Sequence, residues 1–149
     1  WQKALEAGAK PCGLGARDSL RLEKCYPLNG NDLSPDHTPL EAGLGRFVDL
    51  TKAEFVGREA LVKQKSEGIP NRLVAVRMAG KTPPARTGYE VFSGDEKVGE
   101  LTSGGFSTAL DAGIGLALVR SGFHEVGTAL EVEIRGKRHA AEVVPKPFL

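Results

Sequence analysis

The second half of the chain carries short runs of alternating apolar and polar residues, separated by turn signals. In one run Leu130, Val132 and Ile134 alternate with charged residues, which is the period-two pattern of a strand with one buried face. Residues 72–78 alternate in the same way, 89–92 and 97–102 flank a hairpin signal, 113–119 is a strand marked by glycines, and 138–144 follows a turn. Six short strands with turns this regular predict a small, closed, antiparallel β-barrel.

Glycines mark the expected turns and close contacts of this barrel. The stretch Ser93–Glu96 contains Gly and Asp and predicts a hairpin, and Gly136 is expected to be the first residue of a two-residue turn. Ser103-Gly104-Gly105 resembles a nucleophile loop, but no base or orienting acid lies nearby, so we expect a glycine turn. Gly113-Ile114-Gly115 lacks the rest of a dinucleotide fingerprint and is expected to serve strand packing.

The first part of the chain predicts helices and a loop. Trp1, Ala4, Leu5 and Gly8 fall at helical spacing and Pro11 follows as a stop. The chain has no initiating Met and opens inside this helix, so we expect it to be the C-terminal part of a longer protein.

The segment 13–26 fits a helix or a strand, of which the helix is favoured, and 27–35 is a loop rich in Asn, Asp, Gly and Pro. Thr38 and Glu41 form a capping-box pattern with Pro39 between them, which predicts a short helix that Gly43 ends.

A linker with one helix joins the two parts. Residues 58–67 are strong helix formers, with Gly68 just past the end and Pro70 two residues on. We therefore expect an α+β, mostly β chain in three parts. These are the end of a core domain at 1–50, a linker at 51–70 and a β-barrel domain at 71–149.

Charge and composition exclude several classes of function. The formal net charge is +1, which gives no electrostatic reason to bind nucleic acid or an anionic membrane. No apolar run approaches a spanning helix and no signal peptide is visible, so a cytoplasmic protein is expected. Cys12 and Cys25 suit neither a disulfide framework nor a zinc site, and the three histidines are scattered, so no metal is expected.

The segment 13–33 is the candidate binding site. Arg17 offers a planar, permanently charged fork that can bind a carboxylate or the polar edge of a heterocycle. The alternative is an internal ion pair of Arg17 or Arg21 with a nearby acid, either Asp18 or Glu23. Tyr26 and the residues 29–32 are likewise either a polar loop or a pocket wall.

Five segments in fixed order resemble the glycine cleavage system T-protein family. They are GLGARDSLRLEKCYPLNGNDL, TPLEAGLGRFVDL, FVGREAL, PPARTGYEVF and LTSGGFSTALDAGIGLALV. The resemblance covers essentially the whole chain and corresponds to the C-terminal part of the family. It implies the end of a folate-binding core, a linker and a C-terminal β-barrel, in agreement with the three parts expected above.

The resemblance also implies a reaction. Members of the family take an aminomethyl group from the lipoyl arm of the H protein and transfer its one-carbon unit to tetrahydrofolate, with release of ammonia. The expected partners are therefore the lipoylated H protein and tetrahydrofolate, without a metal or a nucleotide. The chemical tasks are to position the folate and to handle a proton.

The family's motifs place two candidate folate-binding residues on this chain. The folate-contacting arginine of the Ala-Arg-Asp motif falls on Arg17, and Arg86 lies in a recurrent barrel motif. Arg86 is expected either to face the folate tail or only to hold the barrel against the core. The family's catalytic aspartate has no counterpart here, so no catalytic residue is assigned and the chain alone is expected to be inactive.

Three other functions share parts of this pattern, one of which is that of the folate-dependent demethylases. Sarcosine and dimethylglycine dehydrogenases carry a similar folate-binding half beside a flavin domain. Folate-binding proteins of iron–sulfur cluster assembly have a Lys-Gly-Cys-Tyr-x-Gly-Gln-Glu loop. This chain departs from that loop, with Asn31-Asp32 where Gln-Glu would stand, so Cys25 is expected to be structural.

Overall fold

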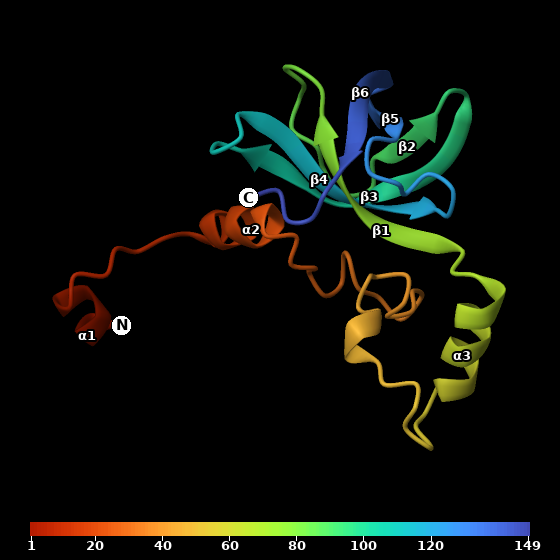
Figure 1. Cartoon of the computed structure of the whole chain (residues 1–149). Helices are drawn as coiled ribbons and strands as arrows, with labels where there is room; N and C mark the ends of the chain where they lie inside the picture. Colours follow the sequence, from red (N-terminus) through yellow and green to blue (C-terminus); the bar gives the residue numbers. More distant parts are fainter.

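The computed structural model describes all residues from Trp1 to Leu149 and is dominated by a closed six-stranded barrel (Figure 1). The strands are β1 (Asn71–Met78), β2 (Glu90–Ser93), β3 (Glu96–Ser107), β4 (Ala112–Arg120), β5 (Ala129–Ile134) and β6 (Lys137–Val144). All neighbouring pairs are antiparallel, in the order β1-β4-β3-β2-β5-β6. The predicted mostly β fold with a six-stranded barrel is confirmed.

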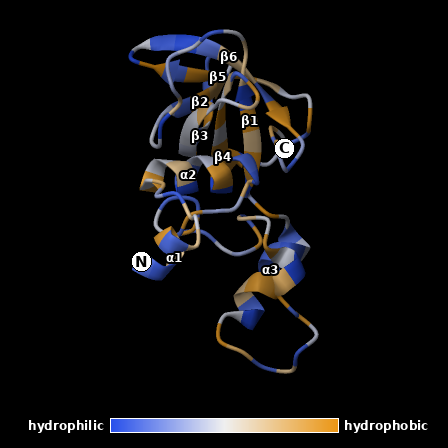
Figure 2. Cartoon of the chain, turned by 90° about the vertical axis from the view of Figure 1, so that its left-hand side faces the viewer, coloured by the Kyte–Doolittle hydropathy of each residue, from blue (hydrophilic) through white to orange (hydrophobic).

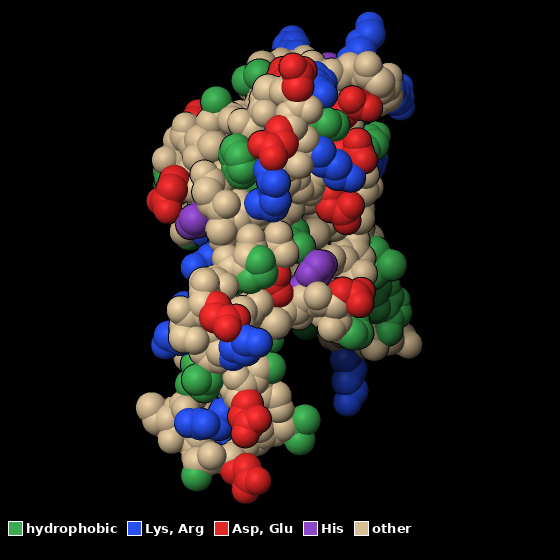
Figure 3. Space-filling view, turned by 90° about the vertical axis from the view of Figure 1, so that its right-hand side faces the viewer, with side chains coloured by type: hydrophobic (Ala, Val, Ile, Leu, Met, Phe, Trp, Pro, Cys, Tyr) green, Lys and Arg blue, Asp and Glu red, His purple; other side chains and the backbone are tan.

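The barrel closes because alternate side chains of each strand fill its interior. Leu130, Val132 and Ile134 of β5 are at most 2% exposed, whereas Glu131 and Glu133 between them are half-buried. The same alternation on the other strands gives a core of 14 buried residues. Figure 2 shows hydrophobic residues concentrated in the barrel strands, while Figure 3 shows both signs of charge interspersed over one face.

Four helical segments lie outside the barrel. They are α1 (Gln2–Glu6), α2 (Leu14–Glu23), the 3-10 turn η1 (Gly45–Phe47) and α3 (Arg58–Glu67). The helices expected at 13–26 and 58–67 are confirmed, and α1 ends before Gly8, which has a positive φ. None of these helices combines the length and the apolar character needed to cross a membrane.

The short helix predicted after Thr38 is wrong, although its capping hydrogen bonds form. The Thr38 N–H donates to Glu41 Oε2 at 2.9 Å, and the Glu41 N–H donates to Thr38 Oγ1 at 3.2 Å. The chain then turns through Gly43 at φ 75° instead of continuing. Glu41 is held by tertiary contacts, because Asn71 donates to its Oε1 at 2.9 Å.

Two predictions about glycines in the barrel are also wrong. Ser103-Gly104-Gly105 is no turn but lies within β3, which continues to Ser107. The tight turn between β5 and β6 consists of Arg135 and Gly136, both at positive φ, so Gly is its second residue. By contrast, Gly113 and Gly115 serve strand packing as predicted, because an added Cβ would lie 2.8 Å from Met78 Cγ and Ser103 O, respectively.

The α2 helix packs on the outside of the barrel, against β3 and β4. Its Leu22 is 2% exposed and joins a second apolar cluster with residues of β1 and β4. The C-terminal tail returns beside α2, where the Phe148 N–H donates to Glu23 O at 3.1 Å (Figure 1). These contacts fix the position of α2 relative to the barrel.

Candidate binding site between helix α2 and the barrel

Helix α2 supplies three charged residues to one side of the site. Arg17 and Arg21 are four residues apart and therefore share a helical face, while Asp18 lies beside them. Arg21 donates through Nε to Asp18 Oδ1 at 2.7 Å. Arg17 is exposed and forms no ion pair. Of the ion pairs expected as the alternative, the one between Arg21 and Asp18 forms, and it leaves Arg17 free.

The loop after α2 is held by one buried carboxylate, Asp32. Its side chain has no exposed surface and accepts from Arg21 Nη1 at 2.8 Å. It also accepts from the Leu28 N–H at 2.7 Å, from Thr102 Oγ1 at 2.5 Å and from Ser103 Oγ at 2.8 Å. A carboxylate with this many donors neutralises the buried guanidinium and satisfies its own oxygens. Asp32 thus joins α2, the 27–33 loop and β3.

The connection between β1 and β2 brings Arg86 and Thr87 to the opposite side. Ala85 is fully buried against β3, at the point where β3 has Gly104. A Cβ on Gly104 would lie only 2.6 Å from the carbonyl carbon of Ala85, so this close approach requires glycine. Thr87 Oγ1 accepts from Asn31 Nδ2 at 3.2 Å, which closes the gap between the two loops.

These elements enclose an open cavity of about 430 Å³, named here the arginine cavity. Six of its ten lining residues are polar or charged, and the lining consists of Leu14, Gly15, Arg17, Asp18, Arg21, Leu28, Asn31, Arg86, Thr87 and Gly104. The fold therefore brings both arginines named from the sequence to one cavity. Neither the Arg17 nor the Arg86 side chain makes a hydrogen bond or an ion pair within the protein, so both guanidinium groups are available to an anionic or polar ligand.

Sequence reasoning named residues 29–32 as either a polar loop or a pocket wall, and it missed other parts of this site. Asn31 lies on the cavity wall and Asp32 behind it, so the loop supplies both a wall residue and a support. Thr87 and Ser103 were not recognised as contributors. Local sequence carries little signal for Ser103, because its role depends on contacts with residues far away in the chain.

Cys25 lies behind the site and not in it. Its thiol is half-buried at the end of α2, where burial raises the pKa above the ordinary value while a backbone hydrogen bond from Phe148 and the charge of Lys146 act in the opposite direction. A raised pKa reduces the thiolate fraction that nucleophilic or metal chemistry would need. This environment supports the structural role expected for Cys25.

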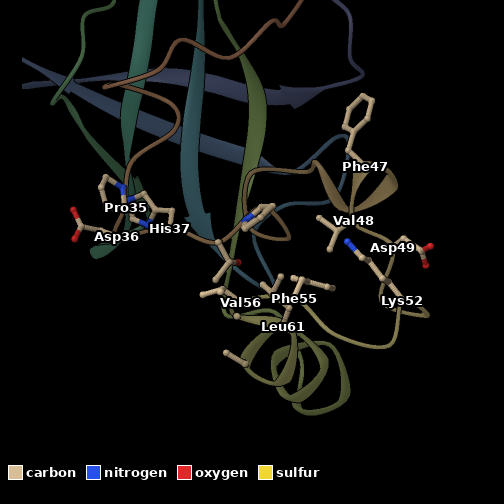
Figure 4. Close-up of a pocket in the computed structure, with 14 residues that line it drawn as sticks. Pro35, Asp36, His37, Phe47, Val48, Asp49, Lys52, Phe55, Val56 and Leu61 are labelled. Carbon is tan, nitrogen blue, oxygen red and sulfur yellow. The ribbon is translucent and has the colours of Figure 1, made fainter.

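A larger cavity, of about 690 Å³, lies elsewhere and is named the linker cavity. In Figure 4 Pro35 and His37 approach it from one side, and Phe47, Val48 and Lys52 from the other. Its lining is largely apolar, and Val56 at its edge is fully exposed. Neither Arg17 nor Arg86 lines the linker cavity. The larger of the two cavities is therefore not the one at which the arginines converge.

Comparison with known proteins agrees with this arrangement. The model of the glycine cleavage T-protein C-terminal barrel domain matches residues 71–149, and that of the GCVT N-terminal domain matches residues 1–52. Aminomethyltransferases of Prochlorococcus marinus and of a Geobacillus species are each 50% identical over 99% of the chain, which covers 40% and 42% of their lengths.

Among solved structures, the glycine cleavage system aminomethyltransferase T of Bartonella henselae superimposes with a TM-score of 0.86. It shares 35% identity, and the match covers 92% of this chain and 39% of that protein. The chain thus spans about two fifths of the length of the relatives that it matches. The barrel, its sequence and its structural neighbour together place this chain in the glycine cleavage T-protein family.

Proposed function

We propose that this chain forms part of a tetrahydrofolate-dependent aminomethyltransferase of the glycine cleavage system, and that the arginine cavity is one wall of its folate pocket. The single observation that supports this most is the convergence of Arg17 and Arg86 on one cavity. The volume of about 430 Å³ lies within the range of small-molecule sites. The relatives named aminomethyltransferase supply the reaction class.

In this proposal the residues of this chain bind and orient the folate. The Arg17 guanidinium can donate two parallel hydrogen bonds to a carboxylate or to the polar edge of the pterin. Arg86 supplies a second positive charge from the barrel side. Holding the acceptor in a fixed position lowers the entropic cost of the transfer from the lipoyl arm of the H protein. No proton-transfer residue is assigned to this chain, so we expect it to bind without catalysing the reaction by itself.

The proposal includes a division of labour along the chain. Residues 1–50 would complete the folate-binding core, residues 51–70 would link it to the barrel, and residues 71–149 would present Arg86. The network around Asp32 joins the first of these parts to β3 of the last.

The test is a calorimetric titration of tetrahydrofolate into the full-length protein and into its Arg17→Ala variant. Loss of a charge-assisted pair should weaken binding by about tenfold or more, equivalent to roughly 1.5–3 kcal/mol. Arg77→Ala is the matched control, because Arg77 is an exposed arginine on β1 outside the arginine cavity. If the wild type does not bind, or if Arg17→Ala binds equally well, the assignment is wrong.

A second assay separates this function from the dehydrogenase alternative. The full-length protein is mixed with aminomethyl-loaded H protein and tetrahydrofolate, and ammonia is measured. An aminomethyltransferase releases ammonia only when both are present. A folate-binding module of a sarcosine or dimethylglycine dehydrogenase would bind tetrahydrofolate in the first experiment but release no ammonia in this one.

A further inference from the structure

A third cavity lies where the linker meets the barrel, and positively charged residues predominate in its lining. This junction cavity has a volume of about 500 Å³ and includes Arg46, Lys65 and Arg72 in its lining. They come from three elements: η1, α3 and the start of β1. Figure 1 shows η1 and α3 on the same side of the barrel.

None of these three cations has a carboxylate partner. Each ion pair in the structure involves other residues, and Arg46 only stacks on the ring of Phe47. The single acid of the lining, Asp49, accepts hydrogen bonds from the N–H and the hydroxyl of Thr51 in its own turn. The lining therefore carries a net charge of +2, and a cleft with an excess of positive charge attracts anions.

Arg72 provides the strongest argument for a ligand in this cavity. Its Nε is the one buried side-chain nitrogen or oxygen in the structure without a hydrogen-bond partner. The Arg72 guanidinium forms no hydrogen bond and no ion pair with any residue of the protein. Buried donors are almost always satisfied, and an unsatisfied one is unfavourable. The Nε atom itself has no accessible surface, and an oxyanion in the junction cavity would pair with the charge of the Arg72 guanidinium, for which the protein provides no partner.

The rest of the lining indicates an organic anion. Leu40, Val48, Leu50 and Ile69 form an apolar part of the cavity beside the three cations. We propose that the junction cavity is a second binding site, for a small organic phosphate or carboxylate with an apolar portion. The ligand's anionic group would lie between Arg46, Lys65 and Arg72, and its apolar portion against the aliphatic side chains.

The site joins separate parts of the family architecture. Arg46 lies in the segment that matches the GCVT N-terminal domain, and Arg72 in the segment that matches the barrel domain. An anion held by both would therefore connect the two segments across the linker. Ligand binding to the folded state alone raises apparent stability, so occupancy should raise the melting temperature as well as give a binding isotherm.

The experiment titrates phenyl phosphate and inorganic phosphate into the full-length protein by calorimetry, at low ionic strength. We expect saturable binding of phenyl phosphate, tighter than that of inorganic phosphate, and a rise in melting temperature. Arg72→Gln and Arg46→Gln should each weaken binding by about tenfold. Arg46 is exposed, so its variant remains informative if Arg72→Gln impairs folding.

Two control variants test whether phenyl phosphate binds in the junction cavity. Arg77→Gln removes an exposed arginine from the same strand as Arg72 and should bind as the wild type does. The tenfold loss caused by Arg46→Gln should persist in an Arg17→Ala background, which separates the junction cavity from the arginine cavity. The proposal is overturned if phenyl phosphate does not bind saturably, if Arg46→Gln binds as the wild type does, or if Arg17→Ala abolishes binding.

Discussion

The Arg21 guanidinium donates to the Asp32 carboxylate at 2.8 Å, and the two side chains are only 10% and 0% exposed. This pair is the structural centre of the arginine cavity. Arg21 belongs to α2, which carries Arg17, and Asp32 also accepts from two hydroxyls of β3. The position of Arg17 relative to the barrel therefore depends on a charge pair of which Arg21 lines the cavity and Asp32 is buried beneath it.

Asp32→Ala should destabilise the protein strongly, because it leaves the Arg21 guanidinium without its buried counter-charge. Removing one partner of a buried ion pair costs about 3–5 kcal/mol, measured here as the free energy of unfolding in urea. Asp95→Ala is the control, because the Asp95 side chain is 114% exposed and should change stability by less than about 0.5 kcal/mol. Equal stabilities for the two variants would contradict the role assigned to Asp32.

Much of the barrel follows from local sequence, because one buried face per strand imposes a period of two. Residues 130–134 show this pattern directly, whereas β1 is buried on both faces at 73–76 because Leu73 and Ala75 join the apolar cluster of Leu22. The path of β3 through Gly104 could not be predicted, since a glycine needed for close backbone approach to Ala85 looks locally like a turn glycine. The same holds for Thr38 and Glu41, whose capping hydrogen bonds form without a helix because Asn71 and Gln64 bind the same groups.

The binding site was predictable only in part. The family motif singled out Arg17, and a separate barrel motif singled out Arg86. That both line one cavity is a consequence of tertiary structure, because the Asn31 to Thr87 hydrogen bond and the packing of Ala85 bring distant segments together. The choice of Asp32 as the partner of Arg21 likewise depends on the loop geometry and not on sequence spacing.

Arg86→Ala should separate the two roles considered for Arg86. The side chain is exposed and makes no ion pair, so its removal should change the free energy of unfolding by less than about 0.5 kcal/mol. Tetrahydrofolate binding should weaken by about tenfold, because a charge-assisted contact is lost. Calorimetry and urea unfolding of the same variant measure the two effects. A large loss of stability with unchanged affinity would mean that Arg86 only holds the barrel in place.

Gly104→Ala should destabilise the barrel and Gly105→Ala should not. A Cβ at position 104 would lie 2.6 Å from the carbonyl carbon of Ala85, whereas one at position 105 meets only the Leu22 Cδ2 at 3.4 Å. Overpacking of this kind costs about 1–3 kcal/mol. The two variants differ by one position in the same strand, which makes thermal unfolding of the pair a matched comparison. Similar melting temperatures would show that the 85–86 segment moves away without cost.

Glu41→Gln should remove a contribution to the free energy of unfolding that depends on pH. Burial opposes ionisation of Glu41, but hydrogen bonds from Thr38 and Asn71 outweigh it and hold the pKa below its ordinary value. The folded-state pKa is thus lower than the unfolded one, near 4.3. Stabilisation by the carboxylate is therefore complete above the unfolded pKa and is lost as the pH falls through the folded pKa.

The measurement is the free energy of unfolding of the wild type and of Glu41→Gln between neutral pH and roughly pH 3, around the ordinary pKa of glutamate. The wild type should be more stable by about 1–2 kcal/mol at neutral pH. The difference should shrink as the pH falls. Glu54→Gln, which changes an exposed linker glutamate, is the control. A difference that stays constant with pH would mean that the charge of Glu41 is not involved.

Arg135→Asn should stabilise the hairpin of β5 and β6. Arg135 and Gly136 are the two turn residues, with φ values of 54° and 75°, and the flanking pair is Ile134 and Lys137. A two-residue turn with positive φ at both positions is type I′, for which Asn-Gly is preferred because Asn tolerates the left-handed region better than Arg. We expect a gain of about 0.5–1 kcal/mol in the free energy of unfolding.

Gly136→Ala should have the opposite effect, since a Cβ is unfavourable at that φ although open space surrounds it. Because the turn lies outside the arginine cavity, tetrahydrofolate affinity should not change in either variant. A loss of stability in Arg135→Asn would mean that contacts of the Arg135 side chain outweigh the strain of its backbone.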